Sequence, residues 1–210
     1  MEPVSVPLRE FDFTEPWNIP EGCPPLVLSR AIDGSPARLA TLVQVFRDPS
    51  TLYVLFSGVD ASIVATRYER DDPLWEEDVL EVFIAPERRT RYFELEVSPI
   101  GTLFDAAIDS PEGERSTMKA DRDWDAAGMW AAIRRVRRES GSLWRFETLV
   151  VIPFAALGRG APAPGERWLA NFYRIDRDEG LGDEYSAWQP TLRDPADFHV
   201  PGRFGELRFE

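Results

Sequence analysis

Residues 78–85 (DVLEVFIA) and 91–97 (RYFELEV) carry the clearest β-strand pattern of the chain. Apolar side chains alternate with other residues in both segments, which is typical of strands that turn one face to a core. Glu81 would therefore lie on the face opposite to Val82. Because only the charged stretch 86–90 separates the segments, they are predicted to be neighbouring antiparallel strands of a hairpin.

The same pattern continues on both sides of this hairpin. Further predicted strands cover residues 39–46, 51–56, 102–106, 130–137, 143–152, 167–175, 185–188 and 206–209, with a turn at 139–141 and one helical turn at 154–157. No amphipathic helix of three turns occurs. The sequence therefore predicts an all-β fold, an antiparallel β-sandwich of immunoglobulin-like or jelly-roll-like two-sheet architecture with few or no helices.

The length of 210 residues is typical of one domain with its own core. No repeat or linker is visible, so residues 1–210 are predicted to form a single β-sandwich domain. The proline-rich segment 1–30 is expected to pack on the sandwich in extended form, and the aromatic residues that would hold it are Phe11, Phe13 and Trp17. Residues 110–128 form a polar loop whose length is often functional or disordered.

The chain is acidic, with 37 Asp and Glu against 24 Lys and Arg and a net charge of −13. This charge argues against nucleic-acid and anionic-membrane partners and favours a neutral or cationic ligand. Cys23 is the only cysteine, so an internal disulfide and a finger-type zinc site are excluded. The chain has no signal-peptide pattern, which fits a cytoplasmic protein or a secreted one whose leader is removed. The oligomeric state stays open.

Three glutamates fall on one face of the predicted hairpin. If the strands are neighbours, Glu81, Glu94 and Glu96 cluster on an exposed or concave face, with Tyr92 beside them and Trp75 at the start of the first strand. Like charges opposed across a sheet are destabilising, so the cluster needs a cation, arginines or ligand hydroxyls. The candidate arginines are Arg91, Arg145 and Arg174. The alternative is that the glutamates simply solvate this face.

Several motifs occur in a fixed order along the chain. They are PLWEEDVLEVFIAP (73–86), RYFELEVSPIGTLFDA (91–106), NFYRID (171–176), SAWQPT (186–191) and FHVPGRFGELRF (198–209). Together they resemble the family 9 carbohydrate-binding modules over about residues 31–209. The resemblance implies a β-sandwich that holds sugar units between two tryptophans, with polar groups on the hydroxyls, and in some members structural calcium.

By position, Trp75 matches the first tryptophan platform of that family and Glu81 matches a polar residue that contacts the sugar. An indole packs on the apolar face of a sugar ring, and carboxylates accept hydrogen bonds from hydroxyls. Glu94 and Glu96 depart from the family, because its sugar-binding members carry an arginine and an asparagine at these places on the strand. The sequence thus predicts an acidic floor beside one platform.

This chain has no tryptophan near the position of the family's second tryptophan. Phe198 and His199 occur there instead. Trp124, in the polar loop, is a candidate for a replacement platform. The remaining tryptophans of the strand segments are expected to pack in the core or at its edges: Trp130, Trp144, Trp168 and Trp188.

No cofactor is predicted with certainty, and metal ligands stay unassigned. The resemblance implies a possible structural Ca²⁺, for which acidic oxygen donors are available at Asp60, Asp71, Asp72 and Asp105. No EF-hand spacing occurs. Haem is improbable because the single histidine, His199, lies between Phe and Val, which is more typical of packing than of ligation.

The leading hypothesis is a non-catalytic module that binds a sugar or polyol by stacking on Trp75 and by hydrogen bonds to the carboxylates. One alternative is a glycoside hydrolase that uses two of the three glutamates, since such enzymes need a carboxylate pair. Another is a protein-interaction module whose acidic face meets a basic partner. No catalytic residue is assigned, and an enzymatic activity is less favoured than binding.

Overall fold

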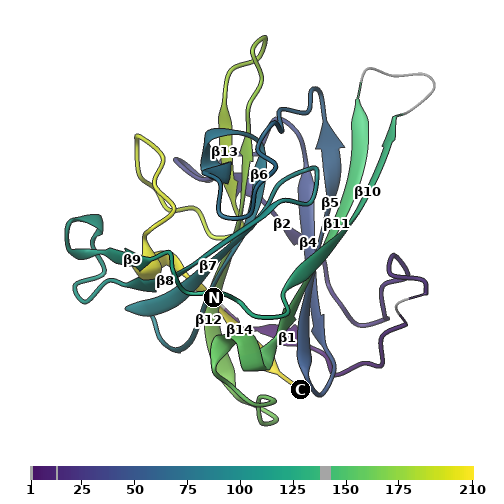
Figure 1. Cartoon of the computed structure of the whole chain (residues 1–210), viewed down its shortest axis with the longest axis vertical. Helices are drawn as coiled ribbons and strands as arrows, with labels where there is room; N and C mark the ends of the chain where they lie inside the picture. Colours follow the sequence, from purple (N-terminus) through teal and green to yellow (C-terminus); the bar gives the residue numbers. More distant parts are fainter. Residues whose placement is uncertain (1, 13, 138–142) are drawn as a thin grey trace.

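The computed structural model describes residues 2–12, 14–137 and 143–210. Phe13 and the turn predicted at 139–141 lie outside the described residues. Two sheets face each other (Figure 1), and the main core lies between them. Every helix among the described residues is a single 3₁₀ turn. These are η1 (Leu74–Glu76), η2 (Arg115–Thr117), η3 (Phe154–Leu157) and η4 (Pro201–Arg203). The predicted all-β sandwich is confirmed, and no described helix has the length and hydropathy of a membrane span.

One sheet has nine strands in the order β1-β14-β12-β6-β7-β8-β9, with β13 paired to β12 and β3 to β13. Its strands are β1 (Val4–Val6), β3 (Ser29–Arg30), β6 (Val79–Arg88), β7 (Arg91–Val97), β8 (Leu103–Asp109), β9 (Lys119–Asp121), β12 (Arg167–Asp176), β13 (Glu184–Ala187) and β14 (Gly205–Phe209). The parallel pairing of β1 with β14 is an exception to the predicted antiparallel pattern. It arises because the N-terminal segment adds to the sheet at its edge.

The second sheet has five strands in the order β10-β11-β5-β4-β2. They are β2 (Leu26–Val27), β4 (Thr41–Arg47), β5 (Thr51–Asp60), β10 (Trp130–Arg137) and β11 (Trp144–Pro153). Part of the N-terminal segment lies on the outer face of this sheet. Phe11 contacts Phe46 and Tyr53 at ring-centroid distances of 5.2 and 4.6 Å, and Trp17 packs against the same cluster. Cys23 is buried there as a free thiol.

The predicted β6–β7 hairpin is confirmed, and its register places Glu81 directly opposite Glu96. Leu80, Val82 and Ile84 face the core between the sheets, as the alternation predicts. The sequence predicts an exposed or concave opposite face of the hairpin. This face is not exposed, because loops and the segment that follows β13 pack a second apolar cluster over part of it, with Phe198 among its members, and the uncovered part is concave. This covered outer face positions the candidate site.

Candidate functional site

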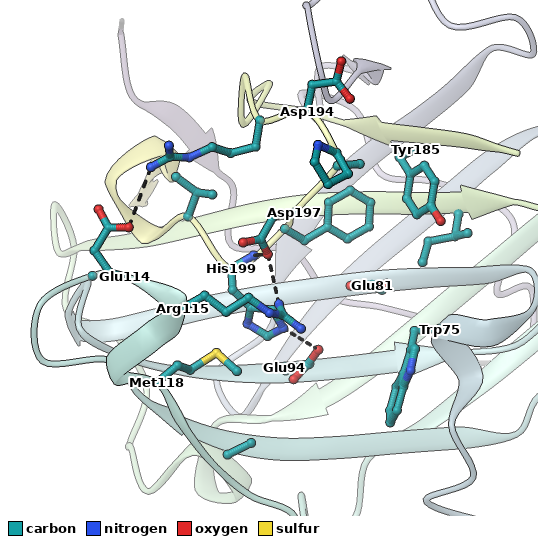
Figure 2. Close-up of a pocket in the computed structure, with 18 of the residues that line it drawn as sticks. Trp75, Glu81, Glu94, Glu114, Arg115, Met118, Tyr185, Asp194, Asp197 and His199 are labelled. Atoms are coloured by element: carbon teal, nitrogen blue, oxygen red, sulfur yellow. Dashed lines mark hydrogen bonds and ion pairs between the residues drawn. The ribbon is translucent and has the colours of Figure 1, made fainter.

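A cleft of about 710 Å³ opens on the outer face of the nine-stranded sheet (Figure 2). Strands β6, β7, β8 and β12 contribute to its floor, and loops around residues 113–122 and 193–200 form its walls. The lining residues that carry chemistry are Trp75, Glu81, Glu94, Arg115, Arg122, Arg177, Asp197 and His199. Five of the predicted site residues thus line one cleft, namely Trp75, Glu81, Glu94, Phe198 and His199.

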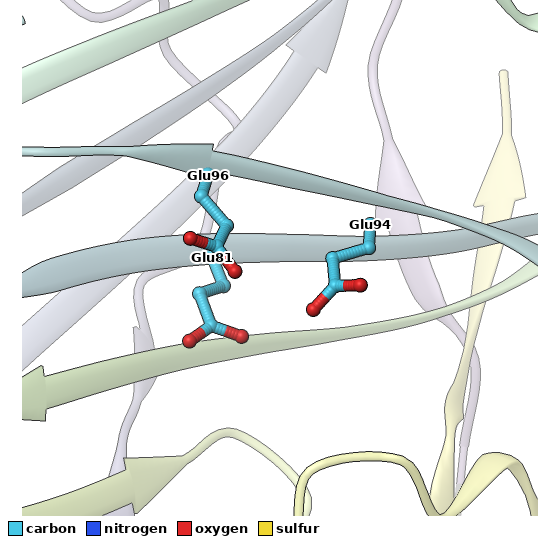
Figure 3. Close-up of side chains that lie close together, drawn as sticks. All are labelled: Glu81, Glu94 and Glu96. Atoms are coloured by element: carbon cyan, nitrogen blue, oxygen red, sulfur yellow. The ribbon is translucent and has the colours of Figure 1, made fainter. Parts of the chain in front are cut away.

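The three predicted glutamates come together at the floor of this cleft, where Glu81 and Glu94 line it and Glu96 lies just beneath. Each offers a carboxylate oxygen, and these oxygens all lie within 4.8 Å of one another (Figure 3). Within the described ranges, no other group of three or more histidine, cysteine or acidic side chains gathers in this way. The exposed fractions are 2% for Glu81, 7% for Glu94 and 0% for Glu96, so the alternative in which these glutamates merely solvate the face does not hold.

Burial dominates the electrostatics of this cluster. It raises the pKa of Glu81 and of Glu96 well above the ordinary range, and neighbouring carboxylates raise both further. Burial also raises the pKa of Glu94 to about 7, against the opposing effect of nearby arginines. Apart from a proton shared with Glu94, no donor among the described residues reaches either carboxylate oxygen of Glu96.

None of the three arginines considered from sequence compensates the glutamates. Arg174 turns to the inner face of β12 and bonds Asp60 and Asp176 at 3.0 Å each. Arg145 belongs to the five-stranded sheet. Arg91 starts β7 and is exposed. The expectation failed because alternation sends Arg91 and Arg174 to the side of the sheet away from the cluster.

Trp75 forms one wall of the cleft from the short turn η1. Its indole is half-buried and makes an edge contact with Phe104 at 5.2 Å, and the guanidinium of Arg122 lies 5.0 Å from its ring centroid. Arg177 donates to the backbone carbonyl of Trp75 at 2.6 Å and forms an ion pair with Asp183. Arg177 therefore anchors the turn that presents the indole.

His199 lies on the other side of the Glu94 carboxylate from Trp75 in Figure 2. Its Nε2 is 3.5 Å from Oε1 of Glu94, and its Nδ1 shares a hydrogen bond of 2.8 Å with the Tyr92 hydroxyl. Burial, together with nearby Arg115, lowers the pKa of His199 to about 4, so the imidazole is neutral near pH 7. Phe198 stacks on Tyr173 at 4.2 Å.

Trp124 is separated from the other predicted site residues. It does not line the cleft; it stacks on Phe93 at 4.6 Å and packs against the core between the sheets. Phe93 and Glu94 are adjacent on β7 and point to opposite faces, so a residue stacked on Phe93 lies away from the glutamates. The structure thus places this tryptophan in a packing position.

Sequence reasoning missed the arginines that line the cleft. Arg115 and Arg122 come from the polar loop predicted at 110–128, and Arg177 follows β12. Arg115 pairs with Asp197 at 3.0 Å across the cleft wall. The unusual length of the loop was the one available signal, since sequence does not reveal which charges of a loop fold back onto a sheet.

The acidic residues considered for calcium have separate partners. Asp60 pairs with Arg174, and Asp105 pairs with Arg70 and accepts a hydrogen bond from the backbone N–H of Ala126. Asp71 also lies near Arg70, and Asp72 accepts from the backbone N–H of Glu69. These four carboxylates do not form one ligand group. Among the described residues, Glu81, Glu94 and Glu96 are the group whose carboxylate oxygens lie close enough together to share a metal ion.

The sequence profile of carbohydrate-binding family 9 matches residues 42–209. The chain belongs to carbohydrate-binding family 9. A comparison with curated protein sequences finds no match.

Solved structures share the family 9 fold at low sequence identity. A candidate carbohydrate-binding protein from Bacteroides uniformis is 20% identical, with 90% of this chain and 87% of that chain covered and a TM-score of 0.72. A family 9 module from Caldicellulosiruptor kristjanssonii in complex with cellotriose is 12% identical, with 100% and 94% covered and a TM-score of 0.62. The corresponding glucose complex is 12% identical, with 100% and 96% covered and a TM-score of 0.63.

Proposed function

We propose that this family 9 protein is a non-catalytic carbohydrate-binding module and that a sugar or polyol occupies the cleft beside Trp75. The observation that carries the proposal is the convergence of a half-buried indole and two carboxylates, Glu81 and Glu94, on one cleft. Family membership supports it, as do the cellotriose and glucose complexes of another family 9 module.

The chemistry of the cleft suits a sugar. The indole of Trp75 offers an apolar face to the C–H face of a sugar ring, while the carboxylates of Glu81 and Glu94 accept hydrogen bonds from its hydroxyls. The cleft volume of about 710 Å³ lies within the usual range of small-molecule sites, about 300–1,000 Å³. Phe198 and His199 supply further contacts in this proposal.

Replacement of Trp75 by alanine tests the proposal. We expect calorimetry with a panel of mono- and oligosaccharides to detect binding by the wild type and at least about tenfold weaker binding by Trp75→Ala, a loss of about 1.4 kcal/mol. Trp130→Ala is the matched control, because Trp130 is 40% exposed and lies in the five-stranded sheet, away from the cleft. Absence of binding by the wild type, or equal binding by Trp75→Ala, would contradict the proposal.

The arrangement does not favour the hydrolase alternative. A glycosidase places its two carboxyl groups on either side of the scissile bond, whereas Glu81, Glu94 and Glu96 lie side by side on adjacent strands. Turnover of a chromogenic glycoside that Glu94→Gln abolishes would reverse this preference. The protein-interaction alternative also loses support, because the acidic face is the floor of a cleft and not an open surface.

A further inference from the structure

The glutamates at the cleft floor lack a basic partner among the described residues. Each arginine that lines the cleft near them is engaged elsewhere: Arg115 with Asp197, Arg177 with Asp183, and Arg122 with the ring of Trp75. His199 approaches Glu94 at 3.5 Å through Nε2, while its Nδ1 is engaged with the Tyr92 hydroxyl. A buried carboxyl group is normally paired with a cation, protonated or bound to a metal, and no basic side chain described above pairs with these three, so a divalent cation that displaces their protons would fit the cluster.

Glu96 is the independent sign that this cluster binds a ligand. Its side chain is 0% exposed and points into the cluster in Figure 3, and in the described part of the chain no hydrogen-bond donor reaches its carboxylate oxygens beyond the proton shared with Glu94. A buried polar group without a partner is destabilising, and a charged one is more so. Its position directly opposite Glu81 would add repulsion between like charges when both groups are ionised, which a bound cation would relieve.

The geometry of the cluster suits one divalent cation. Calcium binds oxygen ligands at about 2.3–2.6 Å, so two ligand oxygens of the same ion lie at most about 4.6–5.2 Å apart. The three carboxylate oxygens all lie within 4.8 Å of one another. Magnesium demands a near-ideal octahedral arrangement and usually keeps several waters, so a cluster of three carboxylates suits calcium better. The all-oxygen ligand set also favours a hard cation over zinc or copper.

The position of the cluster leaves one side of such an ion open. Glu96 lies beneath the floor of the cleft, whereas Glu81 and Glu94 line it. Calcium takes about six to eight oxygen ligands, of which three carboxylates supply about three to six. The remaining positions would face the cleft, where the oxygens of water or of a hydroxylated ligand can reach them.

We propose that Glu81, Glu94 and Glu96 bind a Ca²⁺-type divalent cation at the floor of the cleft, whose free coordination positions take hydroxyl oxygens of the sugar. The second half of this proposal rests on the proposed function. His199 and Tyr92 act as positioning residues, because the hydrogen bond between them aims Nε2 of His199 at Glu94.

Calcium chloride titrated into chelator-treated protein, without sugar, tests the cation site. We expect calorimetry to detect one saturable site, and we expect Glu96→Gln and Glu94→Gln to weaken binding at least about tenfold, since even outer-shell partners of a metal contribute about 10- to 100-fold. Added calcium should also raise the midpoint of thermal unfolding of the wild type but not of Glu96→Gln. The matched control is Glu206→Gln, which removes a surface glutamate of β14 paired with Arg167.

Circular dichroism of each variant checks that it folds. If Glu96→Gln does not fold, Glu94→Gln, whose side chain lines the cleft, still decides whether the cation site exists. The sugar panel is then measured with chelator and with calcium. The proposal is supported if the wild type binds calcium, both variants lose this binding, and sugar binds only when calcium is present. Absence of calcium binding, or equal binding by the variants, overturns the cation site even if sugar binds.

Sugar binding that chelator leaves unchanged overturns the bridging role of the cation. Absence of sugar binding with and without calcium overturns the proposed function, and the calcium titration alone then decides the cation site.

Discussion

Side-chain alternation along β7 decides what each residue of this strand contacts. Phe93 faces the core between the sheets and stacks on Trp124, whereas the adjacent Glu94 faces the cleft and approaches His199. A register shift of one residue would exchange these faces and move the glutamates into the apolar core. The chemistry of the cleft therefore depends on the register of a single hairpin.

Gly205 shows how closely individual residues pack beside the sheet. A Cβ atom at this position would overlap Cη2 of Trp188, whose ring also contacts Phe172 at 5.6 Å. We expect Gly205→Ala to lower the free energy of unfolding by about 1–3 kcal/mol, because overpacking forces neighbouring side chains to move. Gly202→Ala is the control, since none of the described residues would lie within 4 Å of a Cβ atom there. Urea unfolding of both variants measures the difference, and equal stabilities would contradict the packing argument.

At the scale of elements, the N-terminal segment completes the nine-stranded sheet. Strand β1 pairs in parallel with β14, and Leu8 forms a further bridge with Arg47 of the other sheet. The sequence pattern does not reveal β1, because a strand of three residues is too short to establish alternation and Pro3 and Pro7 flank it. Its role follows from burial: Val6 is 0% exposed and belongs to the core between the sheets.

Truncation of Val6 tests whether β1 contributes to the stability of the fold. We expect Val6→Ala to lower the free energy of unfolding by at least about 1 kcal/mol, because it removes buried methyl groups and leaves a cavity. Val27→Ala is the matched control, since Val27 lies on β2 but is 60% exposed and should change stability by no more than about 0.5 kcal/mol. Urea unfolding of the two variants compares them, and a Val6→Ala effect as small as that of the control would mean that β1 is dispensable.

At the scale of the whole molecule, buried acids join the two sheets at one end of the sandwich. Arg174 of β12 bonds Asp60 and the backbone carbonyl of Val59, both on β5 of the opposite sheet. Asp78 accepts hydrogen bonds of 2.7 Å from the backbone N–H groups of Val64 and Arg177. Burial raises the pKa of Asp60 to about 6 and that of Asp78 to about 7. Both acids thus link global stability to pH.

The pH dependence of unfolding tests this link at Asp78. Between about pH 4 and pH 7 the folded protein keeps a proton on Asp78 that the unfolded chain has released. The contribution of this proton to the free energy of unfolding is therefore full below about pH 4 and is lost as the pH rises through about 7. We expect the stability difference between wild type and Asp78→Asn to fall by a few kcal/mol over this range. Chemical denaturation at several pH values measures it, and a difference that does not change with pH would refute the assignment.

Local patterns predicted much of the fold and part of the site. Alternation predicted both strands of the β6–β7 hairpin and the shared face of Glu81, Glu94 and Glu96. It could not predict that this face is buried, because the covering segments lie far away in the sequence. For the same reason the sequence presents Trp124 as a candidate platform, although its partner Phe93 lies on β7 and faces the core.

The sequence by itself determined the strands, their hairpin partners and the faces on which side chains lie, because these follow from a period of two residues and from turns between neighbours. Only the tertiary structure decided that Trp75, Glu94 and His199 meet in one cleft, and that the nearby arginines are engaged elsewhere. The physical reason is that burial and charge pairing are sums over contacts between distant segments, which no local pattern contains.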